Sequence, residues 1–506
     1  MHAFAAWLCL FGAIDAGEAL RAEVTKAVRD DATSLRRVAN DLEKAGKAET
    51  AAEIRDFLET QLPYAAHRFR PLPEVVTQKS RFTNDEIGES AATQIKQSAA
   101  RFFALAQRAA SSEVGRFGLA DELLRLVLER DPDHAEARRL MGFVRHKEGW
   151  ATPHAAQQLR EGKVRHETFG WVPASWVTHL EKGELPGQKF RGEQPSSWLP
   201  AAEADALRAD FWSRPWTITT HHFEIRTNVS LTEAIAFGRT LEAFHDLFFA
   251  KLADLIGPER LPLAQRFADP KLAPKATPKR FKVWYFAERG DFVAFFRREF
   301  HRDETRSLGY TMPPSEAREL GVEPRSYFYR DLDNPIDETS TLYHEASHQL
   351  LFESAGTTQF ERNRGHFWLW EGLGTYFETV RTRQDGTLSV GGVIGPRMQM
   401  AHDRLVERGA LIPIEALCRL SREGYLKEPD VYLNYAQSMA LAAYLLDGSE
   451  EAYREAFLRY VRRAYEGRLQ NGPTFESATG LDPEQIGAQL VEFLRVNAPP
   501  KIESSR

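Results

Sequence analysis

Residues 337–379 read DETSTLYHEASHQLLFESAGTTQFERNRGHFWLWEGLGTYFET. The first part of this stretch, residues 337–355, contains no proline or glycine and therefore favours a helix. His344 and His348 are four residues apart, so on a helix both imidazoles project from one face. Glu345 directly follows the first histidine. In this HExxH spacing, two ring nitrogens can bind one Zn²⁺ while the carboxylate reaches a water on the metal.

A catalytic zinc site needs a third protein ligand and one open coordination position. The metzincin arrangement places glycine and histidine three and six residues after the second histidine, but this chain has Leu351 and Ser354 there. That arrangement is therefore excluded. Glu353 is five residues beyond His348, and on a helix this offset turns it away from the two histidines, so it is a poor ligand.

Glu371 is the better candidate for the third ligand. The sequence predicts a helix stop at Gly356, a polar loop to Gly365 and then a second helix that can return antiparallel. On that second helix Glu371 and Glu378 are seven residues apart and share a face, so one can bind metal while the other orients a ligand. His366, just before this helix, stays open as a third ligand or a substrate contact, although a loop histidine is more often neither.

HEASH followed by GHFWLWEGLGTYFE resembles the gluzincin zinc peptidases of clan MA, which combine HExxH with an aromatic WxxEGxxxYxE helix. The resemblance implies that three side chains bind zinc, namely His344, His348 and Glu371. It also implies that Glu345 is the general base and that Glu378 orients a ligand. The GxMEN motif of the aminopeptidase branch is missing from this chain, so aminopeptidase activity is not implied.

A longer part of the chain, roughly from Thr217 to Leu494, resembles an uncharacterised bacterial family of gluzincin type, often fused behind helical repeats. In aminopeptidase-like gluzincins a tyrosine from the helical half assists the oxyanion, which makes Tyr435 a candidate; the alternative is a tyrosine that packs at a helix start. Gluzincins also bind extended substrate along an edge strand, and residues 326–330 are the candidate for it. The alternative for these residues is an ordinary internal strand.

The composition is that of an ordinary soluble protein, with 506 residues, 42% of them hydrophobic and 27% charged. This length favours about two to four domains. The formal net charge of −6 argues against a nucleic-acid partner. The two cysteines, Cys9 and Cys418, are too few for a disulfide scaffold or a thiolate metal site.

The first residues have the layout of a secretory signal. An apolar run over residues 3–14 is followed by Ala16, Gly17 and Ala19, which predicts cleavage near Ala16 or Ala19. No Lys or Arg precedes the run, so a buried first helix is the alternative. We therefore expect a secreted or periplasmic protein, with a cytoplasmic location as the alternative. No later segment approaches the ~18 apolar residues of a membrane span, so we expect none in the mature chain.

Helical spacing dominates the region that follows. Residues 18–62 predict a helical hairpin, and residues 85–110 predict another helix. The segments Leu119–Leu128 and Ala135–Val144 resemble one tetratricopeptide-type helix pair, although no repeat with a fixed period follows. This region could bind a partner protein or simply cap the catalytic part.

Glycine, proline and tryptophan become frequent from residue 149 to residue 200, which predicts short strands around a core of Trp150, Trp171 and Trp176. Residues 216–227 then alternate as a strand. Neighbours in a strand point to opposite faces, so His221 and His222 are not expected to bind one metal ion together. Strands and helices alternate before the HExxH helix, which predicts a small mixed sheet.

Together these features predict a helix-rich α+β protein. The expected parts are a signal-peptide candidate (1–19), a helical, partly tetratricopeptide-like region (20–148), a β-rich connector and linker (149–200), a thermolysin-like catalytic domain with a small mixed sheet and a helical C-terminal half (201–496), and a tail (497–506). The predicted function is hydrolysis of a peptide or protein substrate with one Zn²⁺ per chain. The alternative is a catalytically silent zinc-binding scaffold, or a partner-binding protein that uses its helical region.

Overall fold

The structure is a computed structural model that describes most of the chain, and its helices and small sheets agree with the predicted α+β class. Two compact units are present: residues 1–60, 72–161 and 247–278 form the first, and residues 61–71, 162–246 and 279–506 form the second. The described residues are 2–59, 62–77, 87–192, 194–272, 278–303, 308–331, 335–355, 363–427, 431–448, 451–469 and 474–498. The predicted helix stop at Gly356 lies outside them.

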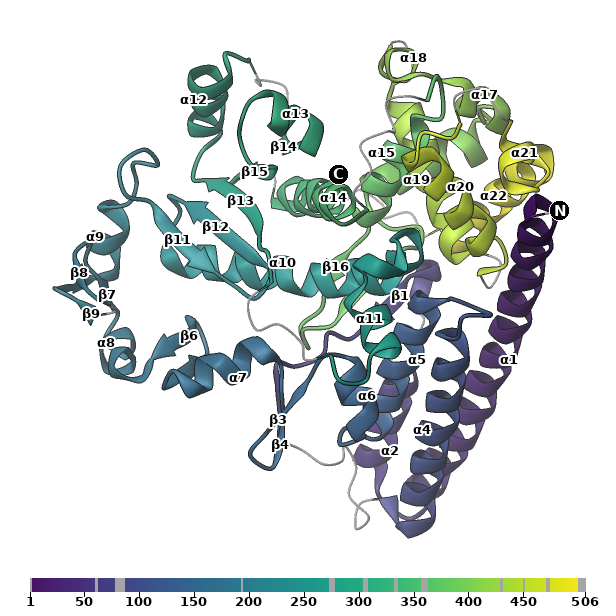
Figure 1. The fold of residues 1–506 in the computed structure, drawn as a ribbon, viewed down its shortest axis with the longest axis horizontal. Coiled ribbons are helices and arrows are strands. Elements are labelled where there is room, and N and C mark those ends of the chain that lie inside the picture. Colours follow the sequence, from purple (N-terminus) through teal and green to yellow (C-terminus); the bar gives the residue numbers. More distant parts are fainter. Residues whose placement is uncertain are drawn as a thin grey trace, which may run out of the picture. The chain divides into compact units, whose positions relative to one another are not determined.

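Long helices dominate the first unit, and they are the labelled helices α1, α2, α4 and α5 of Figure 1. Their bounds are α1 (His2–Lys44), α2 (Ala48–Leu58), α4 (Glu89–Ala109) and α5 (Phe117–Arg130). The helical hairpin and the helix predicted near residues 85–110 are therefore present. The helix α1 includes residues 2–19 of the signal-peptide candidate, whose cleavage stays a prediction.

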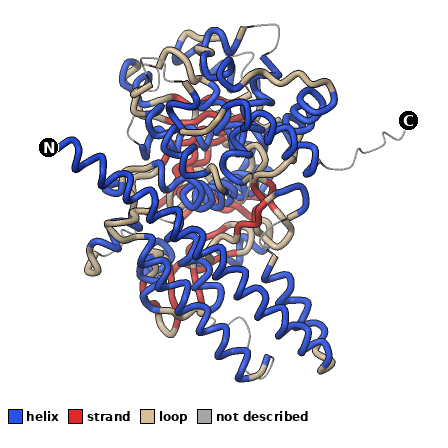
Figure 2. The backbone as a smooth tube through the Cα atoms, turned by 90° about the vertical axis from the view of Figure 1, so that its right-hand side faces the viewer, coloured by secondary structure: helices blue, strands red, loops and turns tan. Residues whose placement is uncertain are grey.

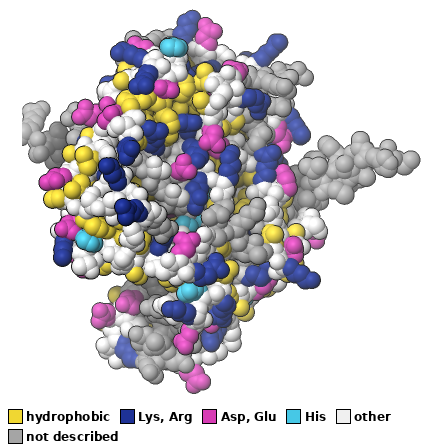
Figure 3. Space-filling view, turned by 60° about the vertical axis from the view of Figure 1, so that its left-hand side comes forward, with side chains coloured by type: hydrophobic (Ala, Val, Ile, Leu, Met, Phe, Trp, Pro, Cys, Tyr) yellow, Lys and Arg dark blue, Asp and Glu magenta, His cyan; other side chains and the backbone are white. Residues whose placement is uncertain are grey.

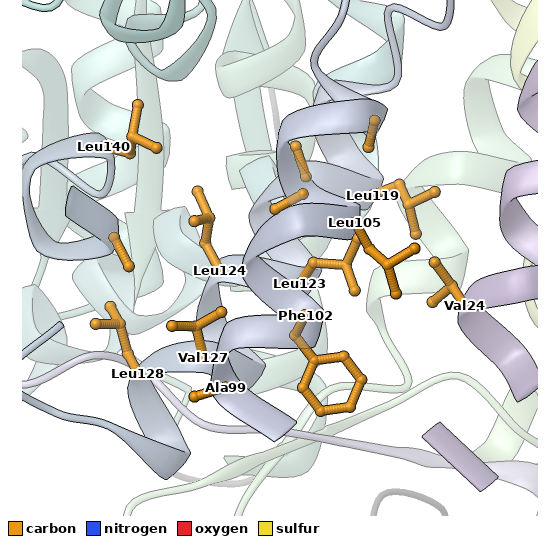
Figure 4. Close-up of a cluster of buried hydrophobic side chains, with 14 of the residues drawn as sticks. Val24, Ala99, Phe102, Leu105, Leu119, Leu123, Leu124, Val127, Leu128 and Leu140 are labelled. Atoms are coloured by element: carbon orange, nitrogen blue, oxygen red, sulfur yellow. The ribbon is translucent and has the colours of Figure 1, made fainter. Parts of the chain in front are cut away.

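The core of the first unit is mainly aliphatic, because α1, α4 and α5 each turn one apolar stripe inward. Figure 4 shows this cluster, in which Phe102 and Leu105 of α4 face Leu123 and Val127 of α5. A buried ion pair adds a directional contact, since the Nε atom of Arg130 donates a hydrogen bond to Asp31 Oδ2 over 3.0 Å.

The second helix of the expected tetratricopeptide pair is shorter than predicted. The helix α6 (Ala135–Leu140) ends before Gly142, whose φ of 87° is a left-handed conformation that stops a helix, and Val144 already begins a strand. The strands β2 (Val75–Val76), β3 (Val144–His146) and β4 (Gly149–Ala151) form a small sheet in the order β2-β4-β3. The helices α7 (Pro153–Arg160) and α11 (Pro262–Ala268) complete this unit, with short 3₁₀ turns at Ala253–Leu255 and Pro258–Arg260.

The expected shared core of three tryptophans is wrong. Trp150 packs with Val76 and Phe143 in the first unit. Trp176 belongs to the second unit and meets Trp198 edge to face, with 5.5 Å between ring centroids. Short elements surround it: β5 (Lys163–His166), β6 (Gly170–Pro173), α8 (Val177–Glu181), β7 (Glu184–Pro186), β8 (Phe190–Arg191), β9 (Gln194–Pro195), β10 (Trp198–Pro200) and α9 (Ala201–Ala206).

A five-stranded mixed sheet forms the centre of the second unit, as the alternation of strands and helices predicts. Its order is β11-β12-β13-β15-β14, and β12, β13 and β15 run parallel while the two outer pairs are antiparallel. The bounds are β11 (Trp216–Thr219), β12 (Phe223–Thr227), β13 (Phe281–Phe286), β14 (Gly309–Met312) and β15 (Arg325–Tyr329). Figure 2 shows the sheets in red among the blue helices.

Two predictions about these strands are wrong. Residues 216–227 form a hairpin of β11 and β12 instead of one strand, so His221 and His222 lie in its turn. The candidate edge strand at residues 326–330 corresponds to β15, which lies between β13 and β14 and is almost wholly buried. The outer strand on that side is β14.

Helices cover both faces of this sheet. Phe237 of α10 (Leu231–Leu252) stacks on Tyr285, whereas Phe295 of α12 (Arg289–Phe300) packs against Trp284 and Tyr327. Because neighbouring strand residues point to opposite faces, α10 and α12 lie on opposite sides. A short helix, α13 (Pro314–Glu319), joins the α12 side through its buried Ala317.

The C-terminal half is helical, as expected. Its buried centre is α19 (Val431–Asp447), which contacts α15, α16, α20 and α22. The other helices are α14 (Pro335–Ala355), α15 (Trp368–Phe377), α16 (Pro396–Ala401), α17 (Ile414–Arg419), α18 (Arg422–Leu426), α20 (Arg454–Tyr465), α21 (Phe475–Thr479) and α22 (Pro483–Asn497). In a sheet of the order β1-β17-β16, the middle strand β17 (Leu388–Val390) pairs with both β1 (His67–Phe69) and β16 (Arg381–Thr382). A π-helical turn covers His402–Glu407, and 3₁₀ turns cover Pro63–Ala65 and Ala174–Trp176.

Basic and acidic side chains are interspersed on the face drawn in Figure 3, in keeping with the small net charge. Within the part of the chain that the structure describes, no helix combines the length and the apolar character that a membrane crossing requires.

Candidate metal centre

Three side chains of the second unit bring potential ligand atoms together: His344 and His348 from α14, and Glu371 from α15. The Nε2 atoms of the two histidines are 3.2 Å apart, and His344 Nε2 is 3.5 Å from Glu371 Oε2. Zinc bonds of about 2.0–2.1 Å at tetrahedral angles place neighbouring ligand atoms about 3.3–3.4 Å apart. These two separations are close to those around a single tetrahedral cation, and all three ligand atoms lie within 4.8 Å of one another. The donor set of two imidazoles and a carboxylate suits zinc.

Close approach of α15 to α14 depends on a glycine. A Cβ atom placed on Gly374 would lie 2.8 Å from Cε1 and 3.0 Å from Nε2 of His344, which is too close for an unmoved imidazole. Gly372 has a similar role on the same helix toward α19, where a Cβ would lie 3.0 Å from the backbone oxygen of Ser438. The Gly-x-Gly of WLWEGLGTYF thus fits α15 between its two neighbours.

Glu378, the candidate for orienting a ligand, lies beside the first histidine. Its Oε1 atom is 3.0 Å from His344 Nδ1, so the Nε2 atom of that ring is the one that faces His348 and Glu371. Arg397 of α16 donates a hydrogen bond from Nε to Glu378 Oε2 over 2.7 Å. This chain of Arg397, Glu378 and His344 fixes the direction of the imidazole and points its Nε2 atom toward the other two candidate ligands.

The electrostatics around His344 favour positive charge. Burial lowers the pKa of His344, but hydrogen bonds to Glu371 and Glu378 outweigh it and raise the pKa to about 10. Burial raises the pKa of Glu378, but the bonds from His344 and Arg397 outweigh it and hold the pKa below its usual range. Carboxylates therefore surround this point with negative charge, which is the environment that a divalent cation requires.

His348 is held as a neutral imidazole. Burial, together with the charge of His344, places the pKa of His348 well below its ordinary value. Its ring stacks on Phe352 at 5.8 Å between centroids and lies 5.2 Å from the ring of Trp370. A neutral ring with an available nitrogen lone pair is the form that binds metal.

Glu345 lies where α14 approaches the outer strand of the sheet. A Cβ on Gly309 of β14 would lie 3.1 Å from Glu345 Cγ, and the Thr311 hydroxyl donates to the backbone oxygen of Glu345 over 2.7 Å. Burial raises the pKa of Glu345, against the lowering effect of His344. The carboxyl therefore holds a proton more readily than an exposed glutamate does.

Tyr435 of α19 is close enough to this cluster to sense its charges. Burial raises the pKa of Tyr435, and the charges of Glu371, Glu345 and Glu378 raise it as well. The guanidinium of Arg397 lies over its ring, 4.8 Å from the centroid. The tyrosine therefore stays protonated near neutral pH and can donate a hydrogen bond.

Other side chains correct or extend the sequence analysis. His366 is buried, and its Nδ1 atom hydrogen-bonds with the Tyr460 hydroxyl; it is not one of the three clustered ligands. Sequence reasoning missed Arg397, because an arginine after an irregular segment carries no recognisable signal. It also missed Gly374, although a glycine three residues after the candidate ligand is a detectable sign of close packing.

Comparison with known families gives one match in this region. A model of the family described as "Protein of unknown function (DUF1570)" matches residues 338–466, which is less than half of the chain. The matched part contains α15, α19 and most of α14, whereas the five-stranded sheet lies before it. The curated proteins gave no match.

Proposed function

We propose that this protein is a zinc-dependent peptidase of the gluzincin type. The observation that carries the proposal is the convergence of three ligand atoms, on His344, His348 and Glu371, within 4.8 Å of one another. The two distances from His344 Nε2 are close to those around a tetrahedral zinc ion. Two neighbours support it, because burial raises the pKa of Glu345 toward the range of a general base and Glu378 Oε1 lies 3.0 Å from His344 Nδ1.

Each side chain has a chemical role in this proposal. A zinc ion held by the three ligands would supply Lewis acidity, which activates water near neutral pH and polarises a carbonyl. Glu345 takes a proton from the attacking water and returns it to the leaving amine, for which its raised pKa is suitable. Tyr435, kept protonated, donates a hydrogen bond to the oxyanion that forms on the substrate.

The strand β14 is the proposed guide for an extended substrate. Among the described strands, it pairs with β15 alone and is the outermost on that side of the sheet. Its residues Gly309 and Thr311 contact α14 next to Glu345. A peptide added along this edge would form main-chain hydrogen bonds and run past the base.

Glu345→Gln tests the mechanism directly. We expect this variant to retain the zinc bound at the site while peptide cleavage falls by at least about 10²–10⁴-fold, because the base is removed and the ligands stay. Zinc is measured by elemental mass spectrometry, and cleavage by mass spectrometry of a mixed peptide library. Glu353→Gln is the matched control, since Glu353 is likewise a partly buried glutamate of α14 but bonds with Gln349 and Lys279.

Each alternative outcome is informative. Cleavage by Glu345→Gln at the wild-type rate would falsify the mechanism. If the wild type holds zinc that Glu371→Ala removes, yet cleaves no peptide, the catalytically silent scaffold becomes the better interpretation. If the wild type and Glu371→Ala hold the same amount of zinc, the assignment of Glu371 as a ligand is contradicted.

A further inference from the structure

A second cluster of potential ligands lies in the turn of the β11–β12 hairpin. β11 ends at Thr219 and β12 begins at Phe223, so the alternation of a strand does not separate His221 from His222. Instead, their ring centroids are 3.9 Å apart at an interplanar angle of 37°. Nitrogen atoms of both rings and a carboxylate oxygen of Glu242 lie within 4.8 Å of one another.

Glu242 reaches this turn from α10 and is held in one orientation. Its Oε1 atom accepts hydrogen bonds from the Thr220 hydroxyl and from the backbone N–H of His222, each over 2.6 Å. Its Oε2 atom is left facing His222 Nδ1 at 2.8 Å. A carboxylate fixed by two donors on one oxygen presents the other oxygen to the histidines without further ordering.

We propose that His221, His222 and Glu242 form a second metal site, separate from the HExxH cluster, that binds a zinc-class divalent cation. Two imidazole nitrogens and one carboxylate oxygen are ligands that zinc, nickel and copper prefer, whereas magnesium and calcium prefer oxygen alone. His222 and Glu242 keep about a fifth and a quarter of their side-chain surface exposed, so a hydrated ion can enter from solvent.

A third ring holds one of the proposed ligands in place. His245 stacks on His222, with 3.8 Å between the ring centroids and an interplanar angle of 11°, which fixes the plane of the His222 ring.

The competing interpretation is a His–Glu ion pair that only fastens the hairpin to α10. The chain offers a matched example of such a pair, in which His179 Nδ1 lies 2.6 Å from Glu184 Oε2 and the His179 ring stacks on Trp198. An ion pair alone requires His222 and Glu242 but not His221. Dependence of metal binding on His221 therefore distinguishes the two interpretations.

The test uses the full chain with the HExxH ligands removed by His344→Ala and His348→Ala. After chelator treatment, the protein is dialysed against a range of Zn²⁺ concentrations, and bound zinc is measured by elemental mass spectrometry. We expect about one zinc per chain, and a loss of affinity of at least about 10-fold in His221→Ala and again in Glu242→Gln. His179→Ala should leave the binding unchanged, and Mg²⁺ should not compete.

Two results would overturn the proposal. The first is that the protein with His344→Ala and His348→Ala binds no more zinc than the same protein that also carries His221→Ala and Glu242→Gln. The second is zinc binding that survives His221→Ala at full affinity. His221 lies in a turn, so its variant keeps the fold available for measurement even if Glu242→Gln lowers stability. Neither result depends on peptidase activity, so the outcome is separate from that of the proposed function.

Discussion

Glu378 is the residue whose two partners make the ligand geometry specific. It accepts from His344 on one carboxylate oxygen and from Arg397 on the other. We expect Glu378→Gln to weaken zinc binding by about 10–100-fold, because the Glu378 carboxylate that holds the His344 imidazole is then missing. Competition with a chromogenic chelator measures this affinity. Arg408→Ala is the control, since Arg408 pairs with Asp403 at the surface; an unchanged affinity in Glu378→Gln would contradict the orienting role.

Sequence reasoning located some of these residues better than others. His344, His348 and Glu378 could be selected because helical spacing alone determines which side chains share a face. Arg397 could not, because its contact with Glu378 depends on the path of the irregular chain after Thr379. The placement of His221 and His222 within one strand was wrong, because alternation alone does not show where a strand turns back into a hairpin.

At the scale of elements, α15 is fitted between α14 and α19 by Gly374 and Gly372. We expect Gly374→Ala to lower zinc affinity by at least about 10-fold, because its Cβ displaces the His344 ring. Gly372→Ala should instead lower the free energy of unfolding by about 1–3 kcal/mol, because its Cβ meets the α19 backbone.

Chelator competition and thermal unfolding of the metal-free proteins measure the two effects. The two variants serve as controls for each other, since both replace glycine by alanine on one helix. If both changes lower the zinc affinity equally, the affinity depends on the position of α15 as a whole and not on the contact between Gly374 and His344.

The order of the strands in the five-stranded sheet could not be predicted from the sequence. Residues 325–329 have the apolar character of a strand, but whether a strand is internal depends on pairing with residues far along the chain. Here β15 pairs with β14, which lies before it in the chain and is separated from it by the helix α13. The two strands run antiparallel. The end of α6 could not be predicted either. Apolar spacing predicts a helix as far as Val144, but the helix ends at Leu140, before the left-handed Gly142.

At the scale of the whole molecule, residues 247–278 belong to the first unit, although the residues before and after them in the sequence belong to the second. Residues 247–278 pack with the N-terminal helices, since Ile256 and Leu261 cluster with Phe117, and Asp254 accepts from the Gly118 backbone N–H over 2.8 Å. The sequence predicts a helix that ends at Ile256 and a proline-punctuated loop after it, and neither indicates that this segment packs with the N-terminal helices. The helix-rich composition and the helical C-terminal half, in contrast, follow from periodicity alone.

Metal removal provides a prediction at this scale. All six ligands of the two proposed sites belong to the second unit. We expect chelation to increase hydrogen–deuterium exchange in α14, in α15 and at the hairpin turn, while α4 and α5 of the first unit keep their protection. Mass spectrometry of peptic peptides measures this exchange. Increased exchange in α4 or α5 of the same magnitude would show that metal stabilises the chain globally.

The short length of β14 has a consequence for substrate selection. The strand contains four residues, and at about 3.3 Å per residue it offers about 13 Å of edge. A peptide laid along it would be read over a window of about four positions. Sequence preferences deduced from cleaved peptides should therefore fade within a few positions of the cut, and any discrimination between whole proteins would have to come from which of their segments are accessible.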